Sequence, residues 1–274
     1  MEGLIAMRKT SLRASLRNGD SVVATFLMLP RLEVVELAAA AGFTAVIIDL
    51  EHGPIAPSEL ASFAAAARGS SIYAIARVAN ASATAIGQAL DAGVDGVMVP
   101  HVCSRADAER VVSFGRYATP GERSLNPYTR GNDYDLGNGT STRDIDERVA
   151  LIVMLEGANI MDRLETICTV PELDVVFVGP VDLSASMGLN GDSNHPRVIA
   201  AVTEALARTH AAERAFGVYA SNPEAGGRWL GLGASLVAVS ADTAVLLGGL
   251  RELRRSVAAA TRLDGGQPTP KVLG

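Results

Sequence analysis

The sequence predicts an α/β protein that folds as a single (β/α)₈, or TIM, barrel. Eight short apolar or β-branched runs alternate with Ala-rich segments of helical character. Strict alternation of strand and helix indicates a parallel sheet, and eight such units close into a barrel. The chain has 274 residues, of which 48% are hydrophobic. It is therefore long enough for one barrel of about 250 residues with one large core.

The eight runs carry charge only at their ends, as expected of strands that are buried on both faces. We place these strands at residues 22–27, 45–49, 73–77, 96–99, 151–155, 175–178, 217–219 and 236–239. A doubly wound open sheet is the structural alternative. No Gly-x-Gly-x-x-Gly motif follows the first run, so the dinucleotide-binding version of that fold has no support.

Helices are predicted between the strands, where Ser, Pro or Gly marks most of the ends. The predicted helices are residues 31–41, 57–68, 82–92, 104–117, 158–169, 196–212, 223–232 and 244–262, with an extra helix at 4–18. Residues 1–263 are thus expected to form one catalytic domain, and residues 264–274 a loose tail. Residues 116–148 form the one long irregular stretch, which either covers part of the barrel mouth or is a peripheral excursion or oligomer contact.

Composition narrows the class of function. The formal charge of −6 and the scattered arginines argue against nucleic-acid binding. No apolar run reaches the roughly 18 residues of a membrane span, and the N-terminus does not resemble a signal peptide. Cys103 and Cys168 have no metal or redox spacing, so we expect reduced thiols in a cytoplasmic protein. The two lysines, Lys9 and Lys271, lie near the termini, which leaves no candidate for Schiff-base catalysis.

Polar side chains follow several predicted strands at their carboxyl ends, where the active site of such a barrel lies. Among them are Glu156 and Asp182, after the fifth and sixth strands. Two carboxylates without a thiolate or a histidine pair suit a hard divalent cation, Mg²⁺ or Mn²⁺, with Co²⁺ and Zn²⁺ left open. The alternative is that each acid only caps the helix that follows it.

Arg77, His52 and Asp49 are the candidates for catalysis. Arg77 ends an apolar strand, and its guanidinium suits a carboxylate or an enolate oxygen. A structural ion pair with Asp49 or Glu51 is the alternative for this arginine. His52 lies beside acids, which would orient it for proton transfer near neutral pH. His101 follows the fourth strand and is expected to have a secondary, pocket-lining role.

The segment Gly179-Pro180-Val181-Asp182-Leu183-Ser184 has the character of a turn that enters a helix. Backbone N–H groups at a helix start can bind an anionic carboxylate. We therefore expect Gly179, Pro180, Val181, Asp182 and Ser184 to contribute to substrate binding. The alternative for Ser184 is that it only caps the helix.

Taken together, several motifs resemble the HpcH/HpaI aldolase family over about residues 21–247. They are Asp49-Leu50-Glu51-His52-Gly53, Leu90-Asp91-Ala92-Gly93, Val99-Pro100, Gly121-x-Arg123, Glu156, Gly179-Pro180-Val181-Asp182-Leu183-Ser184, Asn194-His195-Pro196, Gly233-Ala234 and Val239-Ser240-Ala241-Asp242-Thr243. The order and number of these pieces make the resemblance specific. It implies a barrel of the phosphoenolpyruvate/pyruvate type and a metal-dependent (class II) aldolase. Such an enzyme cleaves a 4-hydroxy-2-oxo acid to pyruvate, or a related 2-oxo acid, and an aldehyde.

The resemblance also implies roles for individual residues. Glu156 and Asp182 match the metal ligands, and Arg77 matches the arginine at the keto or enolate oxygen. His52, paired with Asp49, matches the residues of the acid–base steps. The family further suggests a hexamer, or trimer of dimers, in which subunits exchange the last helix at 244–262.

The chain departs from the family pattern at two places. Met154 stands where family members usually carry Gln, and residues 123–126 differ from the usual Arg-Gly-Val-Gly. The same enolate site could instead serve a decarboxylase or a lyase of CoA thioesters, although no Lys/Arg cluster near the strand ends suits CoA phosphates. A non-catalytic oligomeric binding barrel is the remaining alternative.

Overall fold

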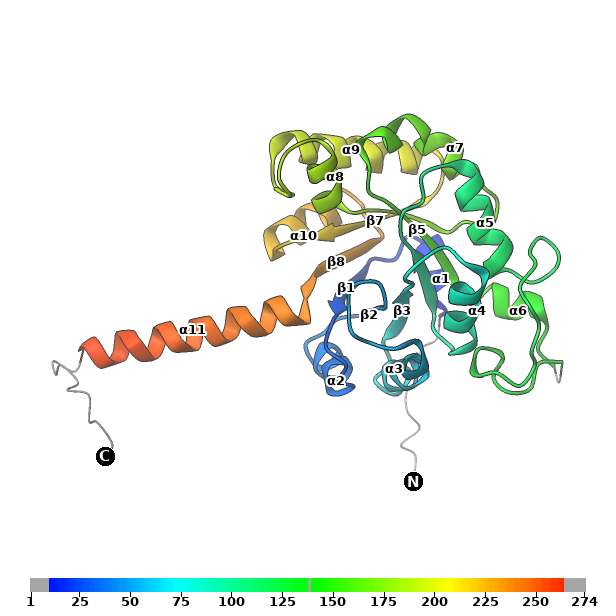
Figure 1. Ribbon diagram of the computed structural model, residues 1–274, viewed down its shortest axis with the longest axis horizontal. Coiled ribbons are helices and arrows are strands. Elements are labelled where there is room, and N and C mark those ends of the chain that lie inside the picture. The colour runs from blue at the N-terminus through cyan, green and yellow to red at the C-terminus, as the bar shows by residue number, and fades with distance from the viewer. Residues whose placement is uncertain (1–9, 138, 264–274) are drawn as a thin grey trace, which may run out of the picture.

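Eight parallel strands close into a barrel in the computed structural model of the protein, which describes residues 10–137 and 139–263 (Figure 1). Each strand pairs with the next one along the chain, and the last strand pairs with the first. The strands are β1 (Val22–Leu27), β2 (Ala45–Asp49), β3 (Tyr73–Arg77), β4 (Gly96–Val99), β5 (Ala150–Leu155), β6 (Val175–Val178), β7 (Ala215–Ala220) and β8 (Leu236–Ala241). The predicted barrel is confirmed, and β5, β7 and β8 extend slightly beyond their predicted bounds.

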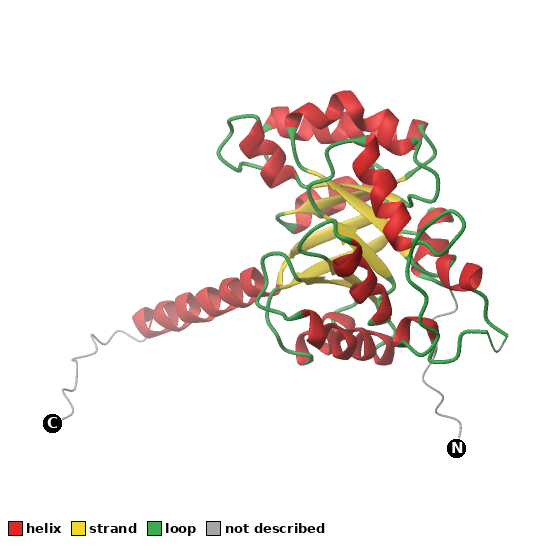
Figure 2. Ribbon diagram, turned by 45° about the vertical axis from the view of Figure 1, so that its right-hand side comes forward, coloured by secondary structure: helices red, strands yellow, loops and turns green. Residues whose placement is uncertain are grey.

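Helices surround the barrel and cover the outer faces of its strands (Figure 2). They are α2 (Glu33–Ala40), α3 (Leu60–Gly69), α4 (Ala83–Asp91), α5 (Arg105–Gly115), α7 (Leu164–Cys168), α8 (Pro180–Ser186), α9 (Pro196–Ala211) and α10 (Pro223–Gly231). Ser82 and Ser104 cap α4 and α5 through their side chains, as their positions predict. The helix predicted at 158–169 is divided into a 3₁₀ segment, η3 (Ala158–Arg163), and α7, and η3 begins without a side-chain cap. No helix in the described part of the chain is long and apolar enough to span a membrane.

The barrel interior is filled by alternate residues of the strands, because successive side chains of a strand point to opposite faces. Ile47, Ile75, Ile152 and Phe177 belong to this inner core. Gly217 is required beside Phe177, because a Cβ at residue 217 would lie 2.5 Å from the phenylalanine ring. By the same alternation, inward-facing residues at the carboxyl ends of the strands lie above this core, at the mouth of the barrel.

Helix α1 (Leu12–Arg17) closes the amino-terminal end of the barrel, where Leu12 and Leu16 join the inner core. The remainder of the helix predicted at 4–18 lies mostly outside the described residues. Next to these leucines, Arg13 and Arg116 are fully buried and both donate to Asp174, at 2.8 and 2.6 Å. Arg13 also pairs with Glu172. This arginine–carboxylate network joins α1 to the segments that precede β5 and β6.

Residues 116–148 form a peripheral excursion and do not cover the mouth. The segment contains η2 (Arg130–Asn132) and α6 (Thr142–Asp146). It packs at the carboxyl end of α4, which lies at the amino-terminal end of the barrel: Arg123 donates to Asp91 at 2.8 Å, and a Cβ at Gly131 would overlap the carbonyl oxygen of Leu90. The sequence left open whether this segment covers the mouth or lies at the periphery, and the structure has it at the periphery.

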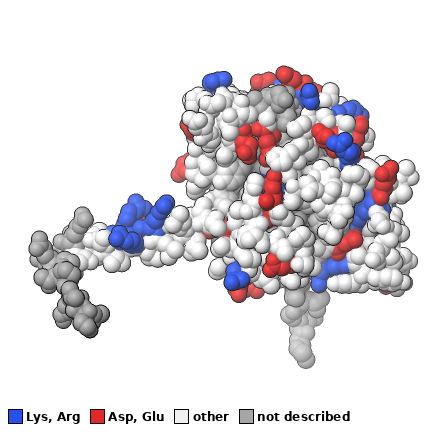
Figure 3. Space-filling view, in the orientation of Figure 1, with Lys and Arg blue, Asp and Glu red and all other residues white. Residues whose placement is uncertain are grey.

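Helix α11 (Asp242–Leu263) projects from the barrel and packs against it only near its first turn (Figure 1). Leu246, Leu250, Leu253 and Val257 are spaced by four, three and four residues, so they share one face of the helix. Each of them is more than half exposed. Basic side chains gather elsewhere along the helix (Figure 3). An apolar helix face of this length is left without a partner within the described chain.

Candidate active site

Arg77 and Asp49 form a two-pronged ion pair at the ends of neighbouring strands. The two residues are direct partners in the register of β2 and β3. The Nε and Nη2 atoms of Arg77 donate to the two carboxylate oxygens of Asp49 at 2.9 and 2.6 Å. Asp49 is fully buried, whereas the guanidinium of Arg77 lies 4.7 Å from the centroid of the Phe26 ring and borders a cavity. The ion pair thus fixes the direction of a positive charge at the mouth.

A tight turn after β2 folds the next residues back over Asp49. The backbone N–H groups of Glu51 and His52 donate to Asp49 Oδ1 at 3.0 and 3.2 Å. A Cβ at Gly53 would lie 2.4 Å from the carbonyl oxygen of Asp49, so only glycine fits there. The turn leaves the His52 side chain 64% exposed, with Nε2 at 3.9 Å from Glu51 Oε2.

This geometry corrects one expectation about His52. The imidazole of His52 is not paired with the Asp49 carboxylate, because both oxygens of that carboxylate are taken by Arg77 and by backbone N–H groups. The acid beside the imidazole is Glu51. Asp49 acts on Arg77 and on the turn.

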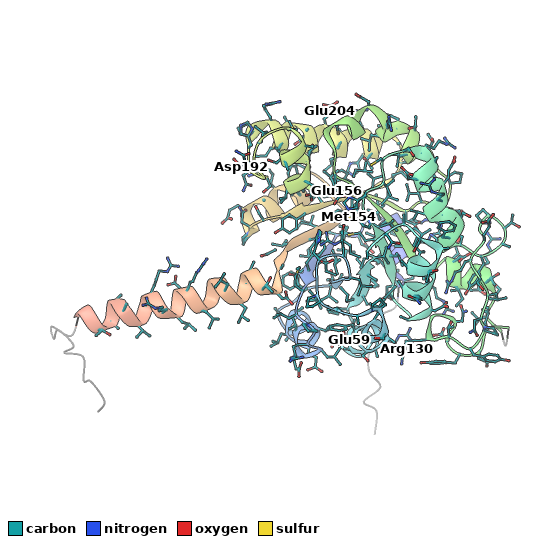
Figure 4. All side chains as sticks on the ribbon, in the orientation of Figure 1. Glu59, Arg130, Met154, Glu156, Asp192 and Glu204 are labelled. Carbon is teal, nitrogen blue, oxygen red and sulfur yellow. The ribbon has the colours of Figure 1, made fainter. Side chains whose placement is uncertain are left out.

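Glu156 and Asp182 meet beside Gly179. A Cβ placed on Gly179 would lie 3.9 Å from Glu156 Oε1 and 3.7 Å from Asp182 Oδ2, so both carboxylates border the same point. Glu156 follows β5 and is largely buried, whereas Asp182 lies in the first turn of α8 and is exposed. Figure 4 places Glu156 and Met154 near the centre of the barrel, at the end of β5.

The environment of Glu156 disfavours its negative charge on balance. Burial raises the pKa of Glu156, and the negative charges of Asp182 and Glu51 raise it further, while His101 acts in the opposite direction. Burial by itself would also raise the pKa of Asp49, but hydrogen bonds and the charge of Arg77 outweigh burial, so that the net shift is downward. The acid beside Asp182 therefore lacks the cation that Asp49 has.

A cavity of about 200 Å³ opens beside these residues. Its lining combines Arg77 and Asp182 with a mostly apolar wall and the backbone of Gly179. The other lining residues are Phe26, Met28, Met154, Phe177, Val181, Tyr219 and Ala241. The cavity is large enough for a small keto acid, and its charged lining residues are Arg77 and Asp182.

Two residues of the predicted binding segment lie away from this cavity. Ser184 is fully buried, and its hydroxyl donates to the carbonyl oxygen of Leu189 at 3.2 Å. Pro180 is buried as the first residue of α8. Gly179, Val181 and Asp182 do line the cavity, so the segment contributes through three of its five predicted residues.

A family model described as HpcH/HpaI aldolase/citrate lyase matches residues 23–248. The chain belongs to this family. Among curated proteins, the hydroxypyruvate/pyruvate aldolase of Pseudomonas aeruginosa is 34% identical over 258 residues, which cover 93% of each chain. The 4-hydroxy-2-oxo-heptane-1,7-dioate aldolase of Salmonella arizonae is 30% identical over 94% of this chain and 98% of its own.

Solved structures of the HpcH/HpaI family have the same fold as this member. The crystal structure of a family protein from Burkholderia cenocepacia superposes with a TM-score of 0.84, at 30% identity, and covers 90% of this chain and 98% of its own. The predicted family and fold are thus confirmed, as is the prediction that this HpcH/HpaI protein is an aldolase-type lyase.

A divalent metal fits the residues of this HpcH/HpaI member. Within residues 10–137 and 139–263, no group of three or more His, Cys, Asp or Glu side chains is placed to hold an ion. A metal would therefore have two carboxylate ligands and would complete its shell with water or substrate oxygens, as Mg²⁺ commonly does. The neighbouring carboxylates of Glu156 and Asp182 supply that donor set.

Sequence reasoning missed part of the mouth of this HpcH/HpaI barrel. Phe26 and Tyr219 line the cavity, but neither was singled out, and Glu51 was named only as an alternative ion-pair partner of Arg77. The period-two alternation of β1 and β7 points both aromatic residues inward and could have identified them. The position of Glu51 depends on the turn at Gly53, which no local pattern specifies.

Proposed function

We propose that this aldolase cleaves a 4-hydroxy-2-oxo acid to pyruvate, or a closely related 2-oxo acid, and an aldehyde, with a divalent metal at Glu156 and Asp182. The observation that carries the proposal is that both carboxylates lie beside Gly179, at a cavity that Asp182 and Arg77 line. A keto acid in this cavity would place its oxygens between two acids that suit a cation and a fixed guanidinium.

Glu156 and Asp182 would hold the ion, most favourably Mg²⁺ or Mn²⁺, because both ligands are hard oxygen donors. When bound, such an ion supplies Lewis-acid polarisation of the keto group. The exposure of Asp182 leaves room for substrate and water oxygens on the cavity side.

Arg77 stabilises the negative charge that develops on the keto oxygen as the carbon–carbon bond breaks. Its guanidinium is already oriented by the two hydrogen bonds to Asp49, so little reorganisation accompanies the reaction. The ring of Phe26 lies against the same guanidinium and keeps water from one of its faces. In the proposed reaction, Arg77 thus supplies a preorganised positive charge for the reacting oxygen.

His52 moves the proton of the 4-hydroxyl group, directly or through water. Its imidazole is exposed at the mouth and has Glu51 as its acidic neighbour. An imidazole nitrogen can accept this proton during cleavage and return it during aldol addition.

The two alternative reactions have less support. A CoA thioester would need basic side chains for its phosphates, and of the described residues that line the cavity, Arg77 is the one basic side chain and is already paired with Asp49. No observation in the cavity favours a decarboxylase over an aldolase.

We also propose that α11 packs against a second copy of the chain, in a hexamer or trimer of dimers. Leu250, Leu253 and Val257 are 56%, 66% and 67% exposed on one helix face. An exposed apolar face on a projecting helix is typical of a protein–protein interface and not of a surface that stays in contact with water. Exchange of α11 between subunits would bury it without a change in the barrel.

Proton exchange tests the enolate chemistry. When the protein is incubated with pyruvate and Mg²⁺ or Mn²⁺ in deuterated water, deuterium should replace the methyl protons of pyruvate. The loss of the methyl proton signal is measured by NMR. Glu156→Gln and Asp182→Asn should lose the exchange, while the matched variant Glu213→Gln, in the turn between α9 and β7, should retain it. A parent protein that binds metal without exchange would favour the non-catalytic binding role, and full exchange in Asp182→Asn would place the metal elsewhere.

A further inference from the structure

His101 lies between two acids at the mouth, and each of its ring nitrogens meets one of them. Nδ1 lies 2.8 Å from Glu156 Oε2, and Nε2 lies 2.8 Å from Glu51 Oε1. The backbone N–H of His101 also donates to Glu156 Oε2, at 3.1 Å. A single residue therefore makes two contacts with Glu156 and one with Glu51.

The fold places His101 there at a conformational cost. The residue follows β4 and Pro100, and its φ of 57° lies in the left-handed region that residues other than glycine adopt infrequently, with His, Asn and Asp the most tolerant of it. This backbone conformation turns the N–H group and the imidazole toward the same carboxylate. Its side chain is 70% exposed, so packing alone does not account for its position.

Glu51 connects this contact to the arginine of the site. Its side chain is 8% exposed, and its Oε2 atom lies 3.4 Å from Arg77 Nε. Glu156, His101, Glu51 and Arg77 thus form a continuous chain of polar contacts across the ends of β2 to β5. Each ring nitrogen of His101 thus lies within hydrogen-bond distance of one acid, and its backbone N–H is a further donor to Glu156.

We propose that His101 is a positioning residue that holds the Glu156 carboxylate in the orientation needed for metal binding and links it, through Glu51, to Arg77. The proposal rests on the proposed function, in which Glu156 is a metal ligand. Partners that hydrogen-bond to a ligating carboxylate orient it, and their loss typically lowers metal affinity by roughly 10–100-fold.

Two conservative variants separate the two ring contacts. An Asn side chain at residue 101 places its amide nitrogen near the position of Nδ1, so His101→Asn keeps a donor for Glu156 and loses the one for Glu51. A Gln side chain reaches the position of Nε2, so His101→Gln does the reverse. Asparagine also tolerates a positive φ. The matched control is His210→Asn, in the last turn of α9, far from the mouth.

The measurement is Mn²⁺ binding to the full-length protein without substrate, by titration calorimetry or by loss of the free Mn²⁺ electron paramagnetic resonance signal. We expect His101→Gln to weaken Mn²⁺ binding by roughly 10–100-fold, and His101→Asn to stay closer to the parent. His210→Asn should match the parent. Raising the Mn²⁺ concentration should restore kcat in His101→Gln, which a general defect of folding would not allow.

Other results would overturn the assignment. Unchanged Mn²⁺ affinity in both His101 variants would show that Glu156 needs no such support. A larger loss in His101→Asn than in His101→Gln would assign the effect to Glu51 and not to Glu156. Absence of Mn²⁺ binding by the parent protein would overturn the proposed function itself, and this inference with it.

Discussion

The guanidinium of Arg77 reaches across from β3 and donates to both carboxylate oxygens of Asp49 on β2, at 2.9 and 2.6 Å. The carboxylate is fully buried, while the arginine borders the cavity. From the sequence, a structural ion pair and a role in substrate binding are alternatives for Arg77. This geometry is compatible with both. Asp49 orients the arginine, and Arg77 still lines the cavity.

Asp49→Asn should lower kcat/KM for retro-aldol cleavage by about 100-fold, because a misplaced catalytic group costs that much. The variant keeps the size of the side chain but loses the charge that orients Arg77. Steady-state kinetics on a 4-hydroxy-2-oxo acid measure the effect, with the exposed Asp20→Asn as control. A kcat/KM within twofold of the parent would mean that Arg77 needs no such support.

The strands could be predicted because their apolar character is local and because a parallel barrel buries both faces of each strand. The inward alternation also carries Asp49, Arg77 and Glu156 to one rim. The contacts of His52 and His101 could not be predicted in the same way. They depend on the turn at Gly53 and on a left-handed residue after β4, which are set by tertiary contacts.

Stability should depend on pH through Asp49. Its pKa is lowered in the folded protein, so the folded state holds this proton less firmly than the unfolded chain does, whose value is about 3.9. The contribution of the ionised Asp49 carboxylate to the free energy of unfolding is complete above about pH 3.9. It is lost as the pH falls through the pKa that Asp49 has in the folded protein. Urea unfolding between pH 7 and pH 3 should show a smaller loss of stability in Asp49→Asn than in the parent. An equal loss in both proteins would contradict this prediction.

Met154→Gln should change the choice of keto acid. The thioether lines the cavity and offers no good partner to a buried hydroxyl group, whereas an amide would. We expect the ratio of activity with hydroxypyruvate to activity with pyruvate to rise by roughly tenfold, since one buried hydrogen bond is worth about 1–1.5 kcal/mol. Initial rates of addition to a common aldehyde measure the ratio. Met154→Leu, which keeps the volume, should leave it unchanged, and a shift of the same size in both variants would rule out the hydrogen-bond explanation.

Leu250→Asp combined with Leu253→Asp should dissociate the assembly. Two charges in the apolar face of α11 would be buried without partners at an interface. Light scattering after size-exclusion chromatography reports the mass of the particle. Ala259→Asp places a single charge on the opposite face of the same helix and should keep the parent mass. A parent protein that elutes as a monomer would refute the proposed oligomer.

The buried network of Arg13, Arg116 and Asp174 lies at the amino-terminal end of the barrel, and the cavity lies at the other end. Residues such as Met28, Val181 and Tyr219 can therefore be randomised without a change in the contacts that fasten α1. This separation makes the protein a suitable starting point for directed evolution of aldehyde selectivity. Libraries confined to the mouth should retain a high fraction of folded clones, whereas libraries at the network should not.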